Sequence, residues 1–186
     1  GPEIHTFVDM WGDLRGSCIN GREANRVYLS RGAAARPQFV DVAPQLGWGP
    51  ETPSRGVLLA DLDDDGDLDV GITHMSGPFA LYRNTRAEGG GAGRHWIGLA
   101  LEGDGAACNR EAAGSRVTIA YDQGGSRVEQ VQEVTIANAF SAQGDRRLHF
   151  GLGPHPGPVE VSIGWCGSAP VSVGSLLPDR YHYIRQ

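Results

Sequence analysis

Residues 57–72 form an acidic loop between two apolar runs: Val57-Leu58-Leu59-Ala60-Asp61-Leu62-Asp63-Asp64-Asp65-Gly66-Asp67-Leu68-Asp69-Val70-Gly71-Ile72. Both runs are short and bounded by loop residues, which is typical of β-strands. The loop itself, residues 61–69, holds six aspartates in nine positions and no basic residue. The sequence therefore predicts a strand–loop–strand unit whose connection concentrates negative charge.

The acidic side chains of this loop have the spacing of a cation site, D-x-D-x-D-G-x-x-D. Calcium takes about six to eight oxygen ligands, and carboxylates at alternate positions of a tight loop can turn toward one centre. Gly66 permits the chain to reverse, and the backbone carbonyl of Asp67 is a further candidate donor. The sequence predicts Ca²⁺ as the ion, with these ligands: Asp61, Asp63, Asp65, Asp67 and Asp69.

Other interpretations of the loop are less favourable. An EF-hand is excluded because its twelfth position is Ile72 instead of Glu and because the flanking runs predict strands instead of helices. A solvated acidic turn without an ion is disfavoured because close carboxylates repel one another strongly unless a cation is present. Magnesium, which prefers octahedral geometry with several waters, is the lesser alternative.

Short apolar or alternating runs recur along the whole chain, and helical periodicity is almost absent. Most runs end at Gly, Pro, Asn or Asp, and Tyr121-Asp122-Gln123-Gly124-Gly125-Ser126 predicts a hairpin turn. One weak helical turn is indicated near residues 43–46. The sequence predicts an all-β fold with strands near residues 27–30, 39–42, 56–60, 68–73, 79–83, 96–102, 115–121, 128–136, 148–151, 159–164 and 181–185.

A Gly-rich linker at residues 87–93 divides the chain into a region of residues 1–86 and a domain of residues 94–186. The first region carries a faint repeat, because Val27-Tyr28-Leu29-Ser30-Arg31 is similar to Leu81-Tyr82-Arg83-Asn84-Thr85. This spacing is typical of β-propeller blades, but about two repeats cannot close a propeller. We expect a partial blade region whose open edges contact an upstream propeller, a second copy or the second domain.

Charge and cysteine content narrow the classes of function. The formal charge is −6, and outside the acidic loop the remaining acidic residues balance the 16 arginines. A nucleic-acid partner is disfavoured because phosphate binding needs a clustered positive surface. No apolar run approaches the roughly 20 residues that span a bilayer, so no membrane insertion is expected.

The three cysteines, Cys18, Cys108 and Cys166, permit at most one disulfide, and the sequence favours three separate thiols.

Two parts of the chain resemble known families. Arg55-Gly56-Val57-Leu58-Leu59-Ala60 with the acidic loop, and then Phe79-Ala80-Leu81-Tyr82-Arg83-Asn84, resembles an FG-GAP/VCBS-type repeat, a propeller blade that holds calcium in such a loop. The second half resembles the ASPIC/UnbV domain. Its matching stretches are Asn109-Arg110-Glu111-Ala112-Ala113-Gly114-Ser115-Arg116-Val117, Asp145-Arg146-Arg147-Leu148-His149-Phe150-Gly151-Leu152-Gly153 and Val159-Glu160-Val161-Ser162-Ile163-Gly164-Trp165.

This order is similar to the C-terminal portion of the cartilage acidic protein family and its bacterial relatives, some of which are encoded beside enediyne antibiotic genes. The resemblance implies a propeller upstream, a small antiparallel β-sandwich at residues 94–186, and a secreted or cell-surface location, with the cytoplasm as the alternative. Cys166 departs from the family pattern, which tends to have Pro after the Trp.

The function that we expect is a calcium-stabilised, non-catalytic binding or scaffold module. Its ligand would be an unidentified protein, glycan or small molecule. The alternative is a portion of an enzyme or accessory protein of enediyne-type natural-product biosynthesis with an interdomain cleft. No catalytic residue is predicted, because no G-x-S-x-G elbow occurs. No organic-cofactor residue is predicted either, because no strand-to-helix switch follows Gly151-Leu152-Gly153. His149 is expected to be a hydrogen-bonded structural residue, Arg146-Arg147 a surface pair, and His95 and Trp96 part of the interdomain contact.

Overall fold

The computed structural model describes residues 24–31, 38–48, 54–74, 77–86, 93–137, 139–140 and 142–186 of the chain. These residues form β-strands and loops, with one short 3-10 helix, η1 (Trp165–Gly167), so the all-β prediction is confirmed. No helix in the described ranges is long and apolar enough to cross a membrane. The predicted linker lies outside the described residues except for Gly93.

The chain forms two compact units. The first comprises Gly1–Arg55 and Ile72–Phe79, and the second comprises Gly56–Gly71 and Ala80–Gln186. The second unit therefore contains the whole acidic loop as well as the C-terminal half of the chain.

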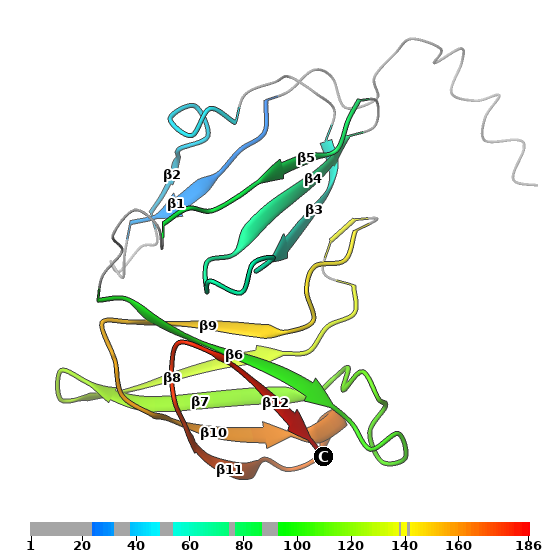
Figure 1. The fold of residues 1–186 in the computed structure, drawn as a ribbon, viewed down its shortest axis with the longest axis vertical. Coiled ribbons are helices and arrows are strands. Elements are labelled where there is room, and N and C mark those ends of the chain that lie inside the picture. The colour runs from blue at the N-terminus through cyan, green and yellow to red at the C-terminus, as the bar shows by residue number, and fades with distance from the viewer. Residues whose placement is uncertain are drawn as a thin grey trace, which may run out of the picture. The chain divides into compact units, whose positions relative to one another are not determined.

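The C-terminal half is a sandwich of two sheets (Figure 1). One sheet has the strand order β11-β10-β7-β8 and the other has the order β12-β6-β9. The predicted hairpin is confirmed, because β7 and β8 pair antiparallel across Gly124 and Gly125. The strands are β6 (His95–Glu102), β7 (Arg116–Gln123), β8 (Ser126–Glu133), β9 (Leu148–Gly153), β10 (Val159–Gly164), β11 (Val171–Leu176) and β12 (Tyr181–Arg185).

Alternating residues of these strands, together with Val134 directly after β8, fill the space between the two sheets. Burying each large apolar side chain stabilises the fold by about 1.5–3 kcal/mol, so this cluster carries most of the stability of the sandwich. Its buried members are Ile97, Leu99, Val117, Ile119, Tyr121, Val134, Leu148, Phe150, Leu152, Val159, Val161 and Ile163.

Two features of the sandwich differ from the sequence-based expectation. β12 pairs with β6 in parallel, whereas the other pairs in the two sheets are antiparallel. β11 was not predicted. It lies at a sheet edge with almost every residue exposed, so it lacks the alternation of buried and exposed residues that marks a half-buried strand.

The remaining strands form two smaller sheets. β1 (Tyr28–Ser30) pairs with β2 (Phe39–Asp41). β3 (Ser54–Ala60), β4 (Asp69–His74) and β5 (Ala80–Tyr82) form a three-stranded sheet in that order. No closed propeller is formed by the described residues, so the blade assignment stays a prediction.

A disulfide joins Cys108 and Cys166, whose Cα atoms are 5.3 Å apart. The disulfide joins the loop before β7 to η1. A hydrogen bond supports the same connection, because the buried hydroxyl of Ser115 accepts from the Cys166 amide at 3.0 Å. The prediction of separate thiols was therefore wrong for these two cysteines. Nothing in their spacing of 58 positions indicated that the fold brings them together. Cys18 lies outside the described residues.

Candidate metal site in the acidic loop

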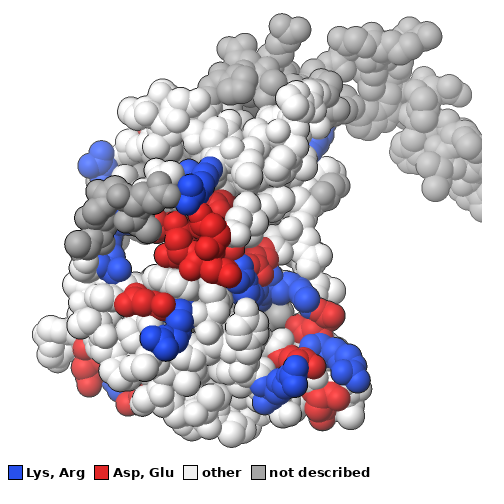
Figure 2. Space-filling model, in the orientation of Figure 1, with Lys and Arg blue, Asp and Glu red and all other residues white. Residues whose placement is uncertain are grey.

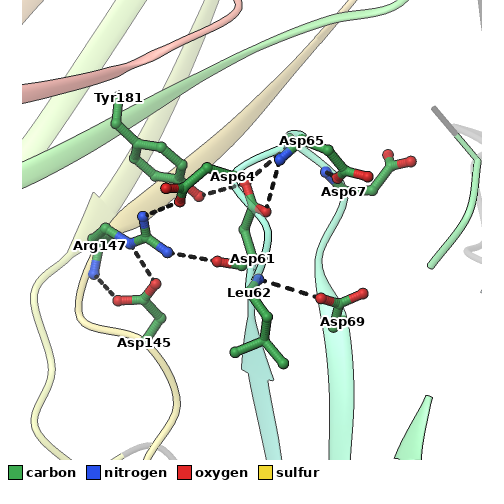
Figure 3. A network of polar contacts seen from close by, with 10 residues as sticks. Asp61, Leu62, Asp64, Asp65, Asp67, Asp69, Asp145, Arg147 and Tyr181 are labelled. Atoms are coloured by element: carbon green, nitrogen blue, oxygen red, sulfur yellow. Dashed lines mark hydrogen bonds and ion pairs between the residues drawn. The ribbon is translucent and has the colours of Figure 1, made fainter. Parts of the chain in front are cut away.

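The acidic loop joins β3 to β4 and curls around the carboxylate of Asp61, which is only 1% exposed (Figure 3). Asp61 Oδ1 accepts a hydrogen bond from the amide of Asp65 at 3.1 Å, and Oδ2 accepts one from the amide of Gly66 at 2.9 Å. Positive φ angles at Asp64 (58°) and Gly66 (90°) allow the reversal. The first aspartate of the motif thus organises the backbone of the loop.

Three of the five predicted ligands are brought together. One carboxylate oxygen from each of Asp61, Asp63 and Asp65 lies within 4.8 Å of the others, so the cluster could hold a metal ion. These donors are hard oxygens, which suit Ca²⁺ or Mg²⁺ rather than thiophilic metals. Asp67 and Asp69 are not part of this group.

Asp69 is buried and closes the loop through the backbone. Its Oδ2 accepts a hydrogen bond from the Leu62 amide at 3.2 Å, and its Oδ1 accepts one from the Asn84 amide at 2.7 Å. The side chain therefore ties the start of the loop to the segment that follows β5. Its role as a ligand stays a prediction.

Asp65 has a carboxylate oxygen that lacks a partner. Oδ1 accepts a 2.8 Å hydrogen bond from the Asp67 amide, whereas Oδ2 is buried without a hydrogen bond. The Asp67 hydrogen bond lowers the pKa of Asp65, but burial and the charges of Asp63, Asp67 and Asp61 together raise it above its ordinary value. An orphaned buried oxygen beside other carboxylates is the environment that a bound cation would satisfy, so these residues fit a metal ion.

An arginine that the sequence did not single out borders the cluster. Arg83 follows β5 and contacts Asp63 Oδ2 through Nε at 2.8 Å and through a terminal nitrogen at 2.6 Å. Figure 2 shows a compact group of acidic side chains with arginines at its border. Arg83 compensates part of the negative charge, and both side chains of the pair are substantially exposed.

Arg147, directly before β9 of the sandwich, also binds the loop. One terminal nitrogen contacts Asp64 Oδ1 at 2.5 Å, and the other donates to the backbone carbonyl of Asp61 at 2.6 Å. Nε donates to Asp145 Oδ2, and the guanidinium lies 4.0 Å from the centre of the Tyr181 ring. Although burial lowers the pKa of Arg147, the hydrogen bonds to Asp64 and Asp145 raise it overall. The expectation of a surface pair was therefore wrong for Arg147, whose side chain is 22% exposed.

Tyr181 and His149 hold the same loop. The Tyr181 hydroxyl donates to Asp61 Oδ2 at 2.9 Å, and His149 Nε2 donates to the carbonyl of Gly66 at 2.7 Å. Burial and the contact with Asp61 raise the pKa of Tyr181. The role expected for His149, a hydrogen-bonded structural residue, agrees with this contact.

Trp96 completes this set of contacts. Its ring stacks on His149 with centroids 5.3 Å apart and meets Tyr181 edge-on at 4.9 Å. A Cβ atom on Gly66 would lie 1.9 Å from Trp96 Nε1, so the indole packs directly on the loop backbone. We call the four side chains that receive the loop, Trp96, Arg147, His149 and Tyr181, the sandwich cradle.

A cavity of about 530 Å³ lies beside the loop and the sandwich cradle. In it, His95 Nδ1 is 2.7 Å from Asp179 Oδ2, and Asp179 adopts a positive φ of 61°. The described residues that line the cavity are Asp64, Asp65, Gly66, Asp67, Arg86, Gly93, Arg94, His95, Trp96, His149, Gly151, Gly153 and Asp179.

Comparison with known protein families finds a match in the C-terminal part of the chain. A search of the curated proteins found no match. Residues 105–186 match the family described as ASPIC and UnbV, and the match includes three members of the sandwich cradle, Arg147, His149 and Tyr181. The match thus supports the ASPIC and UnbV family for residues 105–186 of this chain.

Proposed function

We propose that the acidic loop binds one Ca²⁺ and that the chain is a calcium-stabilised, non-catalytic binding or scaffold module. The observation that carries this proposal is the buried, unpartnered Oδ2 of Asp65 beside a cluster in which Asp61 and Asp63 contribute oxygens within 4.8 Å. The FG-GAP/VCBS-type resemblance of the loop and its flanks supports the same ion.

Asp61, Asp63 and Asp65 would hold the ion, and Asp67 and Asp69 remain the further donors predicted from the sequence. The ion would supply positive charge that cancels the repulsion among these carboxylates. Extracellular calcium modules bind at about 10⁻⁴–10⁻³ M. The Cys108–Cys166 disulfide supports a secreted or cell-surface location, because such bonds persist in oxidising compartments.

The binding part of the proposal is supported by the cavity beside the loop. Its volume of about 530 Å³ is within the range of small-molecule sites, and its lining combines carboxylates, arginines and an indole. A protein, glycan or small molecule with polar groups remains the class of ligand that we propose.

Addition of Ca²⁺ is expected to raise the melting temperature, and a chelator to lower it. At about one hundred times Kd, a ligand specific for the native state stabilises it by about 2.7 kcal/mol. In a chain of this size that corresponds to a rise of about 5–10 °C. Differential scanning fluorimetry in Ca²⁺, in Mg²⁺ and in chelator measures the effect.

The matched control is the double variant Asp63→Asn, Asp65→Asn, which keeps the size of both side chains and removes two charges from the cluster. Its melting temperature should not respond to Ca²⁺. An unchanged wild-type melting temperature at about 10–100 mM Ca²⁺, one hundred times this Kd, would contradict the proposal. An equal response to Mg²⁺ at the same concentration would contradict the choice of ion.

The cavity also favours the second candidate function, a portion of an enzyme or accessory protein of natural-product biosynthesis. A His–carboxylate pair such as His95–Asp179 is an arrangement that general-base catalysis uses. No serine, threonine or cysteine is among the described residues that line the cavity, so a hydroxyl or thiol nucleophile has no candidate there. His95→Gln would reduce turnover if an activity depends on this pair, and it should leave the calcium response intact.

A further inference from the structure

We infer that the sandwich cradle positions the acidic loop for its cation, so that Tyr181 and Arg147 set the metal affinity of carboxylates far away in the sequence. The inference rests on the proposed calcium site and assigns these residues a role in it. Tyr181 is separated from Asp61 by 120 positions, and Arg147 from Asp64 by 83.

Tyr181 determines which oxygen of Asp61 remains open to a cation. Asp61 Oδ2 accepts two hydrogen bonds, from the Gly66 amide and from the Tyr181 hydroxyl, both at 2.9 Å. Oδ1 accepts one, from the Asp65 amide. A carboxylate oxygen has two lone pairs, so Oδ2 is saturated and Oδ1 keeps one lone pair. Tyr181 therefore orients the carboxylate with Oδ1 as the ligand atom.

Arg147 binds Asp64, the neighbouring aspartate that is not part of the cluster of Asp61, Asp63 and Asp65. It holds the Asp64 carboxylate and the Asp61 carbonyl at the same time, as Figure 3 shows. Asp64 lies between Asp63 and Asp65 in the sequence, has a positive φ of 58° and is not part of the cluster. The two hydrogen bonds of the guanidinium, one to Asp64 and one to Asp61, hold the Asp64 side chain in this position.

Trp96 and His149 fix the apex of the loop. His149 donates to the Gly66 carbonyl at 2.7 Å, and the indole of Trp96 packs where a side chain on Gly66 would be. The amide of Gly66 in turn donates to Asp61 Oδ2. The contacts of Trp96 and His149 are thus transmitted to Asp61 through the backbone of Gly66.

The charge of Arg147 and its hydrogen-bond geometry have opposite expected effects on cation binding by the loop. The variants are therefore chosen to separate these two effects. Loss of the guanidinium charge would strengthen the attraction of the loop for a cation, whereas loss of its geometry would weaken binding. Arg147→Lys keeps the charge and removes the simultaneous hydrogen bonds to the Asp64 carboxylate and the Asp61 carbonyl. Tyr181→Phe changes no charge and removes one hydrogen bond, so it is the primary variant.

The test is the Ca²⁺ dissociation constant measured by isothermal titration calorimetry for the wild type, for Tyr181→Phe and for Tyr183→Phe. Tyr183 lies on the same strand as Tyr181 but is 77% exposed, so its variant is a matched control. Mutation of a residue that orients a metal ligand by a hydrogen bond typically weakens metal binding by about 10–100-fold. We expect Tyr181→Phe to weaken Ca²⁺ binding about tenfold, and Tyr183→Phe to leave it unchanged.

A purely structural role of Tyr181 would lower the melting temperature in chelator without changing the dissociation constant, and that result would overturn the inference. Wild-type binding with equal constants for both variants would overturn it while leaving the proposed function standing. A wild type that does not bind Ca²⁺ would overturn both. If Tyr181→Phe fails to fold, Arg147→Lys is measured in its place, and an unchanged constant for that variant also overturns the inference.

Discussion

Replacing Gly66 by alanine is expected to destabilise the native state by about 3 kcal/mol or more and to abolish the calcium response. Two costs add at this position. The residue has a φ of 90°, where an L side chain is strained by about 1–3 kcal/mol. The new methyl group would also lie 1.9 Å from Trp96 Nε1 and 2.1 Å from Trp96 Cε2. Overpacking of this kind costs about 1–3 kcal/mol more.

The indole has little freedom to move aside. Trp96 is stacked against His149 and meets Tyr181 edge-on, and its backbone belongs to β6 in the sandwich. The loop is therefore expected to leave the cradle, with loss of the hydrogen bond from His149 to the Gly66 carbonyl. Thermal unfolding and calcium titration of the variant measure both consequences.

Gly114→Ala is the matched control for this substitution. Gly114 has a similar φ of 83°, but a Cβ atom there would have no neighbour within 4 Å. Its variant should show the backbone strain alone, about 1–3 kcal/mol as at Gly66, and a normal calcium response. Equal loss of stability in the two variants would show that the contact with Trp96 contributes nothing.

Removal of the disulfide is expected to cost about 4 kcal/mol. In the chain-entropy account, a bridge that closes a longer loop restricts the unfolded chain more. Cys108 and Cys166 are 58 positions apart, and the segment between them includes four strands of the sandwich. The double variant Cys108→Ser, Cys166→Ser should therefore unfold at a clearly lower denaturant concentration than the wild type.

Cys18→Ser is the control, because it removes a thiol and keeps the bridge. Reductant should destabilise the wild type and Cys18→Ser, and it should not affect the double variant. A thiol count on denatured, unreduced wild-type protein gives an independent check. Of the three cysteines, one should react, and reaction of all three would contradict the bridge.

Local sequence patterns were sufficient to predict the all-β fold and the core of the candidate site. Period-2 alternation indicated strands such as β7, and the aspartate spacing indicated that Asp61, Asp63 and Asp65 would meet. Both signals are local, because a strand repeats every two residues and the loop spans nine positions.

The sandwich cradle was not predicted as a unit, because its members are distant from the loop in sequence. The sequence predicts a surface position for Arg147, because a pair of arginines before a strand is usually solvated. Nothing in the sequence around Tyr181 indicated that its hydroxyl would reach Asp61. The parallel pairing of β12 with β6 places Tyr181 opposite Gly98, where the absence of a side chain leaves room for the ring.

The distance in sequence between the acidic loop and β12 imposes an order on folding during synthesis. The loop leaves the ribosome long before Tyr181, which contacts it across 120 positions. Contacts of such separation form late, because a long segment must first be ordered. Until β12 has paired with β6, the nascent loop has its backbone hydrogen bonds but not its complete set of supports. On the proposed role of Tyr181, full Ca²⁺ affinity is therefore expected only after β12 has paired with β6.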